Sequence, residues 1–224
     1  MKHPQFTLNL DRPADFSPSA FARAPGNEAT LRLIEQWPDW PAPAVCIAGP
    51  AASGKSHLGM MWMERAGARA IALSTLQAGD IEGGLTEPLW IDHQNEGAFD
   101  EDVLFHTLNL AREEQGSILI TARTAPAKWK VVLPDLASRL KAIPVVEISA
   151  PDDGLVEAIL IKRFSDLGID ADPVVMRYLL ARMERSYAAI EAVTRAFGRQ
   201  TLAAQRRASA PLAAQVLEDL ENSR

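Results

Sequence analysis

The residues best suited to chemistry lie in one short loop. Residues 49–56 read Gly-Pro-Ala-Ala-Ser-Gly-Lys-Ser and match the phosphate-binding pattern G-x-x-x-x-G-K-[ST]. The glycines let consecutive backbone N–H groups surround phosphate oxygens, Lys55 adds a positive charge for the β- and γ-phosphates, and the Ser56 hydroxyl suits Mg²⁺. An apolar run at 44–48 and a helix-compatible run at 57–65 give the strand–loop–helix context that such a loop needs. The sequence therefore predicts a site for ATP or ADP with Mg²⁺, in which the nucleotide-binding residues are Gly49, Pro50, Ala51, Ala52, Ser53, Gly54, Lys55, Ser56 and His57.

Two later strand ends supply polar groups for the same site. Asp92 ends the apolar run 88–92, where an acid beside a phosphate loop can hold Mg²⁺, although it could instead only cap the following turn. The run 117–121 ends in Thr121-Ala122-Arg123, where a side chain could reach the γ-phosphate, although a capping threonine is an equally good explanation. Hydrolysis also needs a group that activates water, and His93 holds that position either as a water-orienting residue or as a loop residue without a role. We expect the following assignments: Thr121 as a nucleotide ligand, Ser56 and Asp92 as metal ligands, and Asp92 also as a catalytic residue.

Short apolar runs alternate with helical segments through the middle of the chain, which is typical of an α/β fold with a parallel sheet. The expected strands are 43–48, 69–73, 88–92, 117–121 and 144–148, and the expected helices between them are 55–66, 99–115 and 134–141. After this the pattern is entirely helical, at about 154–167, 172–184, 186–207 and 211–221. The first forty or so residues are expected to be a Pro-rich lead-in that ends in a stiff connector at 37–41. We expect three parts: a flexible N-terminal peptide 1–13, a nucleotide-binding α/β domain 14–151 and a small all-helical lid domain 152–224.

The bulk composition favours a cytoplasmic protein. The chain has 224 residues, and no apolar stretch approaches the length of a membrane span or the core of a signal peptide. Cys46 is the only cysteine, so we expect a small buried hydrophobe and no disulfide. A net charge of −6 argues against a broad nucleic-acid-binding surface, so any DNA contact is expected to be indirect or weak. One basic cluster is better explained as a solvated helix face than as a DNA contact: Arg195, Arg199, Arg206 and Arg207.

The most specific motif lies further along the chain. Residues 133–140 read Leu-Pro-Asp-Leu-Ala-Ser-Arg-Leu, and Arg139 near the end could neutralise charge on a nucleotide held by a neighbouring subunit or form a surface salt bridge. Three further segments precede this motif in the chain, namely residues 49–58, 91–92 and 118–121, and all four occur in the order found in one protein family. Together they resemble the AAA+ module of the DnaA-like family, from about residue 14 to the C-terminus. Within that family, the chain is most similar to the shorter regulatory members of the Hda type.

The resemblance implies a role for each matching residue. Lys55 and Ser56 would be the phosphate and Mg²⁺ residues, Asp92 the Walker B acid, and Thr121 part of the sensor 1 strand. Arg139 would be an arginine finger that acts in trans on nucleotide bound by a DnaA partner. The segment 21–27 resembles the part of the family that packs near the adenine. Initiators of the family carry a further DNA-binding domain after the lid, so we do not expect this chain to be an initiator.

Two positions depart from the family pattern. His93 stands where initiators usually have a second acid, and Ala188 stands where the lid usually has an arginine. Arg185 lies one helical turn before Ala188 on a similar face and could substitute for the missing arginine. Both departures favour a protein that uses nucleotide as a conformational cofactor and hydrolyses it slowly if at all. Whether the resident nucleotide is ATP or ADP stays open.

A second motif lies at the N-terminus. Residues 5–10 read Gln-Phe-Thr-Leu-Asn-Leu and resemble the peptides that dock on the DNA polymerase III β sliding clamp. In an extended peptide Phe6, Leu8 and Leu10 share one face and can enter an apolar groove, while Gln5 can hydrogen-bond at its rim. On pattern alone, an N-terminal edge strand is an equally good explanation. The resemblance of the remaining chain to Hda-type proteins, which carry such a peptide, favours the clamp.

The combined hypothesis is a regulator of chromosomal replication, tethered to the clamp, that stimulates ATP hydrolysis by DnaA after initiation. Its partners would be DnaA and the clamp, and its location the cytoplasm near the replisome. Pairing with another copy of itself is plausible for a family that shares sites between subunits. Two alternatives stay open: a self-sufficient P-loop ATPase of the helicase-loader type, and an adaptor on the clamp that works without nucleotide.

Overall fold

The computed structural model describes residue 21 and residues 27–94, 97–170, 172–204 and 208–222. The proposed clamp peptide at 5–10 lies outside these residues, as do Arg206 and Arg207. The chain divides into a unit spanning 23–150 and a helical unit that begins at Pro151. Each unit has its own hydrophobic core.

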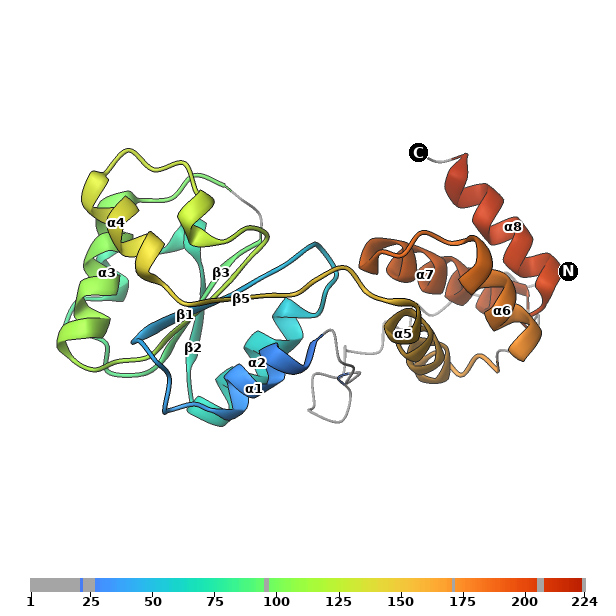
Figure 1. Cartoon of the computed structure of the whole chain (residues 1–224), viewed down its shortest axis with the longest axis horizontal. Helices are drawn as coiled ribbons and strands as arrows, with labels where there is room; N and C mark the ends of the chain where they lie inside the picture. The colour runs from blue at the N-terminus through green and yellow to red at the C-terminus, as the bar shows by residue number, and fades with distance from the viewer. Residues whose placement is uncertain (1–20, 22–26, 95–96, 171, 205–207, 223–224) are drawn as a thin grey trace, which may run out of the picture. The chain divides into compact units, whose positions relative to one another are not determined.

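The first unit is built on a parallel five-stranded sheet (Figure 1). The strands lie in the order β2-β3-β4-β1-β5, so that β3, β4 and β1 each have a neighbouring strand on both sides. Every residue of β1 and β4 is buried, as expected for parallel strands covered on both faces. The predicted fold class is confirmed, and each strand begins and ends within one residue of its predicted position: β1 Ala44–Ala48, β2 Arg69–Ala72, β3 Leu89–His93, β4 Ile118–Ala122 and β5 Val145–Glu147.

Helices cover both faces of this sheet. Helices α3 (Glu101–Glu113) and α4 (Pro134–Ala142) pack on one face, where alternate strand residues such as Cys46, Ile91 and Ile120 form the core. Helix α2 (Lys55–Ala66) contacts β3 and β4 from the other face and α1 packs beside it. Burial raises the pKa of the Cys46 thiol to about 12, which makes it the inert hydrophobe expected from the sequence.

The Pro-rich lead-in expected over the first forty or so residues contains a helix that was not predicted. Helix α1 spans Glu28–Glu35 and buries Leu31, Leu33 and Ile34, which recur at helical spacing inside a segment flanked by prolines. The segment taken for a stiff connector is instead part of the packing around α2. Trp40 stacks on Trp62 with ring centroids 5.1 Å apart, and Trp37 meets the same ring edge-on at 6.3 Å.

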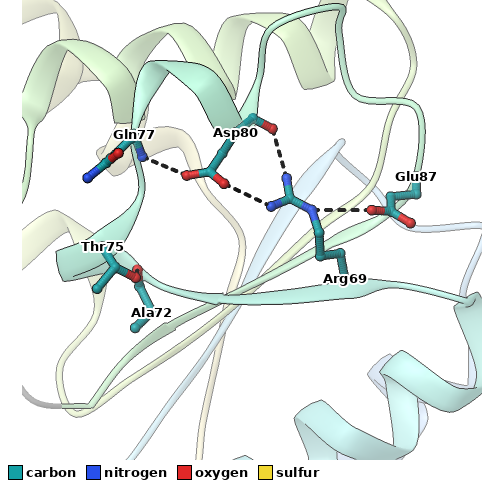
Figure 2. Close-up of polar contacts among 6 residues, drawn as sticks. All are labelled: Arg69, Ala72, Thr75, Gln77, Asp80 and Glu87. Carbon is teal, nitrogen blue, oxygen red and sulfur yellow. Dashed lines mark hydrogen bonds and ion pairs between the residues drawn. The ribbon is translucent and has the colours of Figure 1, made fainter.

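The connection between β2 and β3 is held by one arginine (Figure 2). Arg69 Nη2 donates to the Asp80 carbonyl at 2.8 Å, Nη1 lies 3.2 Å from Asp80 Oδ1, and Nε lies 3.2 Å from Glu87 Oε1. The second Asp80 oxygen accepts the backbone N–H of Gln77 at 2.9 Å. A polar cavity of about 260 Å³ lies here, but the guanidinium on its wall is already occupied, which indicates a structural role.

The described part of the second unit contains four helices, each predicted from the sequence. Asp152, Asp172 and Ser209 cap three of them by accepting backbone N–H groups of the first turn. Phe164 and Phe197 meet at 5.2 Å in its core. No helix among the described residues is long and apolar enough to cross a membrane. The helices are α5 Asp153–Asp166, α6 Pro173–Arg182, α7 Tyr187–Ala204 and α8 Ala210–Glu221.

Candidate nucleotide-binding site

The phosphate loop connects the end of β1 to the start of α2. Its first N–H, from Gly49, donates to the Ala122 carbonyl at 3.1 Å and so ties the loop to the end of β4. A Cβ at Gly49 would lie 2.9 Å from Ile148 Cβ, so only glycine fits there. Ala52 and Gly54 have φ values of 62° and 89°, and α2 begins at the next residue after Gly54. The loop therefore has the sharp turns that bring backbone N–H groups to a helix N-terminus.

Lys55 is the first residue of α2, and its side chain folds back into the loop. It is only 1% exposed. Its Nζ donates to the carbonyls of Gly49 at 2.8 Å and Pro50 at 2.6 Å, and lies 3.4 Å from Ser53 Oγ. The ammonium group is therefore enclosed by the backbone of the phosphate loop. A phosphate oxygen entering the loop would take over some of these hydrogen bonds.

The environment of Lys55 lowers its pKa to about 8, because burial deprives the charged form of hydration and so makes it less favourable. The carboxylate of Asp92 opposes this shift, while the positive charge of Arg123 adds to it. A buried cation that is only partly compensated favours binding of an anion. We therefore regard this part of the loop as the phosphate site.

A chain of hydrogen bonds fixes Asp92 at the end of β3. The Trp90 indole Nε1 donates to Thr121 Oγ1 at 2.9 Å, and the Thr121 hydroxyl donates to Asp92 Oδ1 at 2.8 Å. Thr121 is fully buried and its single proton is used on the carboxylate. A methyl group at Gly59 would lie 2.3 Å from the Trp90 ring, so the glycine in α2 leaves room for this indole. In this arrangement Thr121 positions Asp92, whereas the sequence led us to expect a direct phosphate contact.

Ser56 and Asp92 provide the oxygens expected at a Mg²⁺ site. The Ser56 hydroxyl accepts a hydrogen bond from Gln94 Nε2 at 2.7 Å, a partner that sequence reasoning missed. Within the described residues no group of three or more His, Cys, Asp and Glu side chains is placed to hold a metal. One hydroxyl and one carboxylate nonetheless fit Mg²⁺, which takes one or two protein oxygens and completes its shell with phosphates and water. When bound, the ion would neutralise phosphate charge.

His93 faces away from these groups. Successive strand residues point to opposite faces, and the His93 ring packs 4.4 Å from the Trp129 ring and 5.4 Å from Phe99, among residues of the α3–α4 face. It is 7% exposed. The position that would carry a water-activating acid is thus occupied by a ring built into an aromatic cluster.

Arg139 lies in the last turn of α4, in the helix layer opposite α2. Leu136 and Leu140 anchor this helix in the core, and Glu101 fixes its start by accepting the backbone N–H groups of Val132 and Leu133 at 2.7–2.9 Å. Arg139 is half-buried. Its guanidinium has no hydrogen-bond or ion-pair partner in the part of the chain that the structure describes, so the surface salt bridge considered from the sequence is not found there.

The remaining predicted positions are less informative. His57 is half-buried in the first turn of α2, and Ala51 is exposed on the loop. In the helical unit Arg185 Nε lies 2.8 Å from Asp153 Oδ1 and its Nη1 contacts the Met183 carbonyl. Arg185 therefore already has partners within its own unit, which weakens the suggestion that it replaces the missing lid arginine.

Comparison with known proteins identifies the fold. No protein-family model and no curated protein sequence matches the chain. Among solved structures, domain III of the Thermotoga maritima replication initiation protein DnaA matches with a TM-score of 0.73 at 18% identity, covering 92% of this chain and 96% of that one. The chain has the AAA+ fold.

Two longer AAA+ proteins show the same similarity. AMPPCP-bound DnaA from Aquifex aeolicus gives a TM-score of 0.64 at 18% identity, covering 80% of this chain and 65% of that one. The Thermotoga maritima RuvB Holliday junction branch migration motor gives 0.66 at 16% identity, covering 87% and 68%. This chain thus spans about two thirds of their length. At these identities the likeness establishes the fold, and the roles of individual residues depend on the site geometry above.

The buried ammonium predicts a pH dependence of stability. Because the pKa of Lys55 is lower in the folded chain than in the unfolded one, the folded chain loses its proton first as pH rises, and stability increases between about pH 8 and 10. Relative to Lys55→Met, the wild type should gain about 2 kcal/mol of unfolding free energy from pH 7 to 9.5. Urea unfolding of both proteins at each pH measures this difference, and a difference that is constant with pH would contradict it.

The hydrogen-bond chain from Trp90 through Thr121 to Asp92 predicts that substitutions of its members have coupled effects on the free energy of unfolding. Thr121→Val leaves a carboxylate oxygen and an indole N–H without their partner and should cost about 1–3 kcal/mol. The control Thr124→Val, on an exposed threonine three residues later, should stay within about 0.5 kcal/mol of the wild type. In a double-mutant cycle with Trp90→Phe, the combined loss should be smaller than the sum of the single losses, because both remove one network. Additive losses would show that the two bonds are independent.

Proposed function

We propose that this AAA+ chain is a nucleotide-binding regulator of the DnaA initiator that supplies Arg139 in trans to a partner's ATP site. The observation that carries the proposal is the α4 helix: its buried leucines and the Glu101 contact hold it rigidly, while Arg139 at its end has no partner among the described residues. An arginine presented in this way can neutralise charge that develops on a transferring phosphoryl group. The resemblance of residues 133–140 to the family motif supports this role.

The nucleotide held by the chain itself would be a structural cofactor. Lys55 and the loop N–H groups would bind the phosphates of ATP or ADP, and Ser56 and Asp92 would hold Mg²⁺. One similar structure is described as DnaA bound to AMPPCP and single-stranded DNA, at 17% identity and a TM-score of 0.64. Because His93 packs against Trp129 and Phe99, no second acid activates water at this position, which favours slow turnover.

Clamp tethering is the second part of the proposal. Residues 5–10 would localise the protein on β clamps on DNA and raise its effective concentration near DnaA. The first alternative is a self-sufficient P-loop ATPase. Such a protein would hydrolyse ATP by itself, would lose this activity on Lys55→Ala, and would not depend on Gln5. An adaptor without nucleotide function would keep full stability and partner binding when purified free of nucleotide.

Arg139→Ala should abolish the stimulation of DnaA-bound ATP hydrolysis, because an arginine finger contributes on the order of 10³-fold to phosphoryl transfer. The measurement is single-turnover hydrolysis by DnaA with clamp-loaded DNA and added regulator. Arg112→Ala, which removes an exposed arginine from the last turn of α3, is the charge-matched control and should stimulate like the wild type. Full stimulation by the Arg139 variant would refute the trans role.

The clamp peptide predicts a separate loss. A variant with Gln5→Ala and Leu8→Ala should lose binding to the purified β clamp, since it removes one rim hydrogen-bonding group and one apolar anchor. Surface-immobilised clamp measures the affinity, and Arg139→Ala should bind it as tightly as the wild type. Unchanged binding by the peptide variant would remove clamp docking through residues 5–10 from the proposal.

A further inference from the structure

Three aromatic rings form a closed cluster at the end of β3. The His93 ring lies 4.4 Å from the Trp129 ring and 5.4 Å from the Phe99 ring, and the Phe99 and Trp129 rings are 5.9 Å apart. The three residues come from β3, from the segment before α3 and from the segment before α4. His93 is buried, and the other two are half-buried. The cluster therefore joins the strand that carries Asp92 to the segment that leads into α4.

Side chains in the segment 129–133 alternate between packed and exposed. Trp129, Val131 and Leu133 pack against the core of the α3–α4 face, whereas Lys130 and Val132 are exposed. The backbone is extended at Trp129 and at Leu133, where φ and ψ are −70° and 142° and −74° and 111°. The segment thus lies as an extended strip on the helix layer, with every second side chain anchored.

Contacts fix this strip at both of its ends. At its end, Glu101 accepts the backbone N–H groups of Val132 and Leu133 at 2.7–2.9 Å, and Leu133 is the N-cap of α4. At its start, the aromatic cluster holds Trp129. Helix α4 follows without a further loop, and its last turn carries Arg139. The direction in which α4 presents this arginine therefore depends on both anchors.

We propose that His93 is a positioning residue for Arg139, because its ring supports Trp129 and so fixes the start of the strip that leads into α4. The inference rests on the proposed role of Arg139 in trans. An arginine that completes a partner's site must be placed closely, since a displacement of about 1 Å can lower a rate about a hundredfold. Asp92 is held separately by the Thr121 hydroxyl, so a substitution at the neighbouring residue leaves that hydrogen bond in place.

The proposal also gives a reason for the residue type at position 93. An acid here would bury a carboxylate against two aromatic rings, which is costly without compensating hydrogen bonds. A histidine ring instead meets Phe99 edge-on, with an interplanar angle of 84°, and packs on Trp129 at 59°. Support of this kind depends on the shape of the ring and not on its charge. Phenylalanine is therefore the conservative replacement.

The test compares His93→Ala with His93→Phe in two measurements. The first is hydrogen exchange of the backbone amides of Val132 and Leu133 by NMR, and the second is the rate of ATP hydrolysis by DnaA against regulator concentration. His93→Ala should accelerate this exchange about tenfold or more and lower the maximal stimulated rate about ten- to hundredfold. The half-saturating concentration and the affinity for Mg²⁺–AMPPCP should change less than about threefold. His93→Phe should recover most of both losses.

Two further variants separate positioning from a loss of stability. Trp129→Leu removes the other ring of the contact from a half-buried position, and it should show the same changes even if His93→Ala folds poorly. Trp40→Ala removes an aromatic contact on the α2 side of the sheet, where Trp40 stacks on Trp62 at 5.1 Å. This control should keep the exchange rates of Val132 and Leu133 and the maximal stimulated rate of the wild type.

Unchanged exchange in His93→Ala and Trp129→Leu would overturn the positioning role, as would a full maximal rate in both variants. An equal loss of rate in Trp40→Ala would also overturn it, because the effect would then reflect general instability. Absence of stimulation by the wild type, together with faster exchange in His93→Ala, would overturn the proposed function and leave the link from His93 to α4 standing.

Discussion

The ammonium group of Lys55 is buried at the carboxyl edge of the sheet, and the arrangement around it follows from that burial. Removing a charge from water is costly unless hydrogen bonds and an opposite charge compensate. The carbonyls of Gly49 and Pro50 supply the hydrogen bonds, and Asp92 supplies the opposite charge. Both depend on the parallel register that brings the ends of β1, β3 and β4 together. Compensation by one carboxylate is incomplete, as the lowered pKa shows, and a phosphate is the anion that the loop geometry suits.

Successive residues of β3 point to opposite faces of the sheet, so that Asp92 and His93 lie in different surroundings. Asp92 points to the α2 side, where Trp90 and Thr121 hold its carboxylate by hydrogen bonds. His93, the next residue, points to the α3–α4 side and packs with Trp129. Under the proposed function, this arrangement would hold a nucleotide with little provision for activating water. The α3–α4 side instead presents Arg139, whose position on a well-anchored helix suits a contact with another protein.

Much of the fold could be predicted from the sequence because its signals are local. The strands are short apolar runs between turn residues, and the phosphate loop fixes where one strand ends and a helix begins. Helix α1 was missed because prolines on both sides of 28–35 concealed the helical spacing of Leu31 and Ile34. Some of those prolines precede the helix in the sequence. The others follow it, in the segment whose Trp37 and Trp40 pack on Trp62.

The members of the site could be predicted from the sequence, but their contacts could not. The pattern located Lys55, Asp92 and Thr121, yet the direction of the Thr121 hydroxyl depends on Trp90, 31 residues away in the chain. Gln94 belongs to no motif. Its hydrogen bond to Ser56 depends on the end of β3 lying beside the phosphate loop, which only the pairing of β1, β3 and β4 brings about.

Binding of Mg²⁺–ADP and Mg²⁺–AMPPCP to the purified chain, compared with Lys55→Met, is the most direct test of the proposed phosphate site. We predict saturable binding of nucleotide by the wild type and loss of that binding in a variant that still folds. Equal binding by both proteins would show that the buried ammonium does not form the phosphate site. Absence of binding by the folded wild type would contradict the nucleotide-binding role altogether.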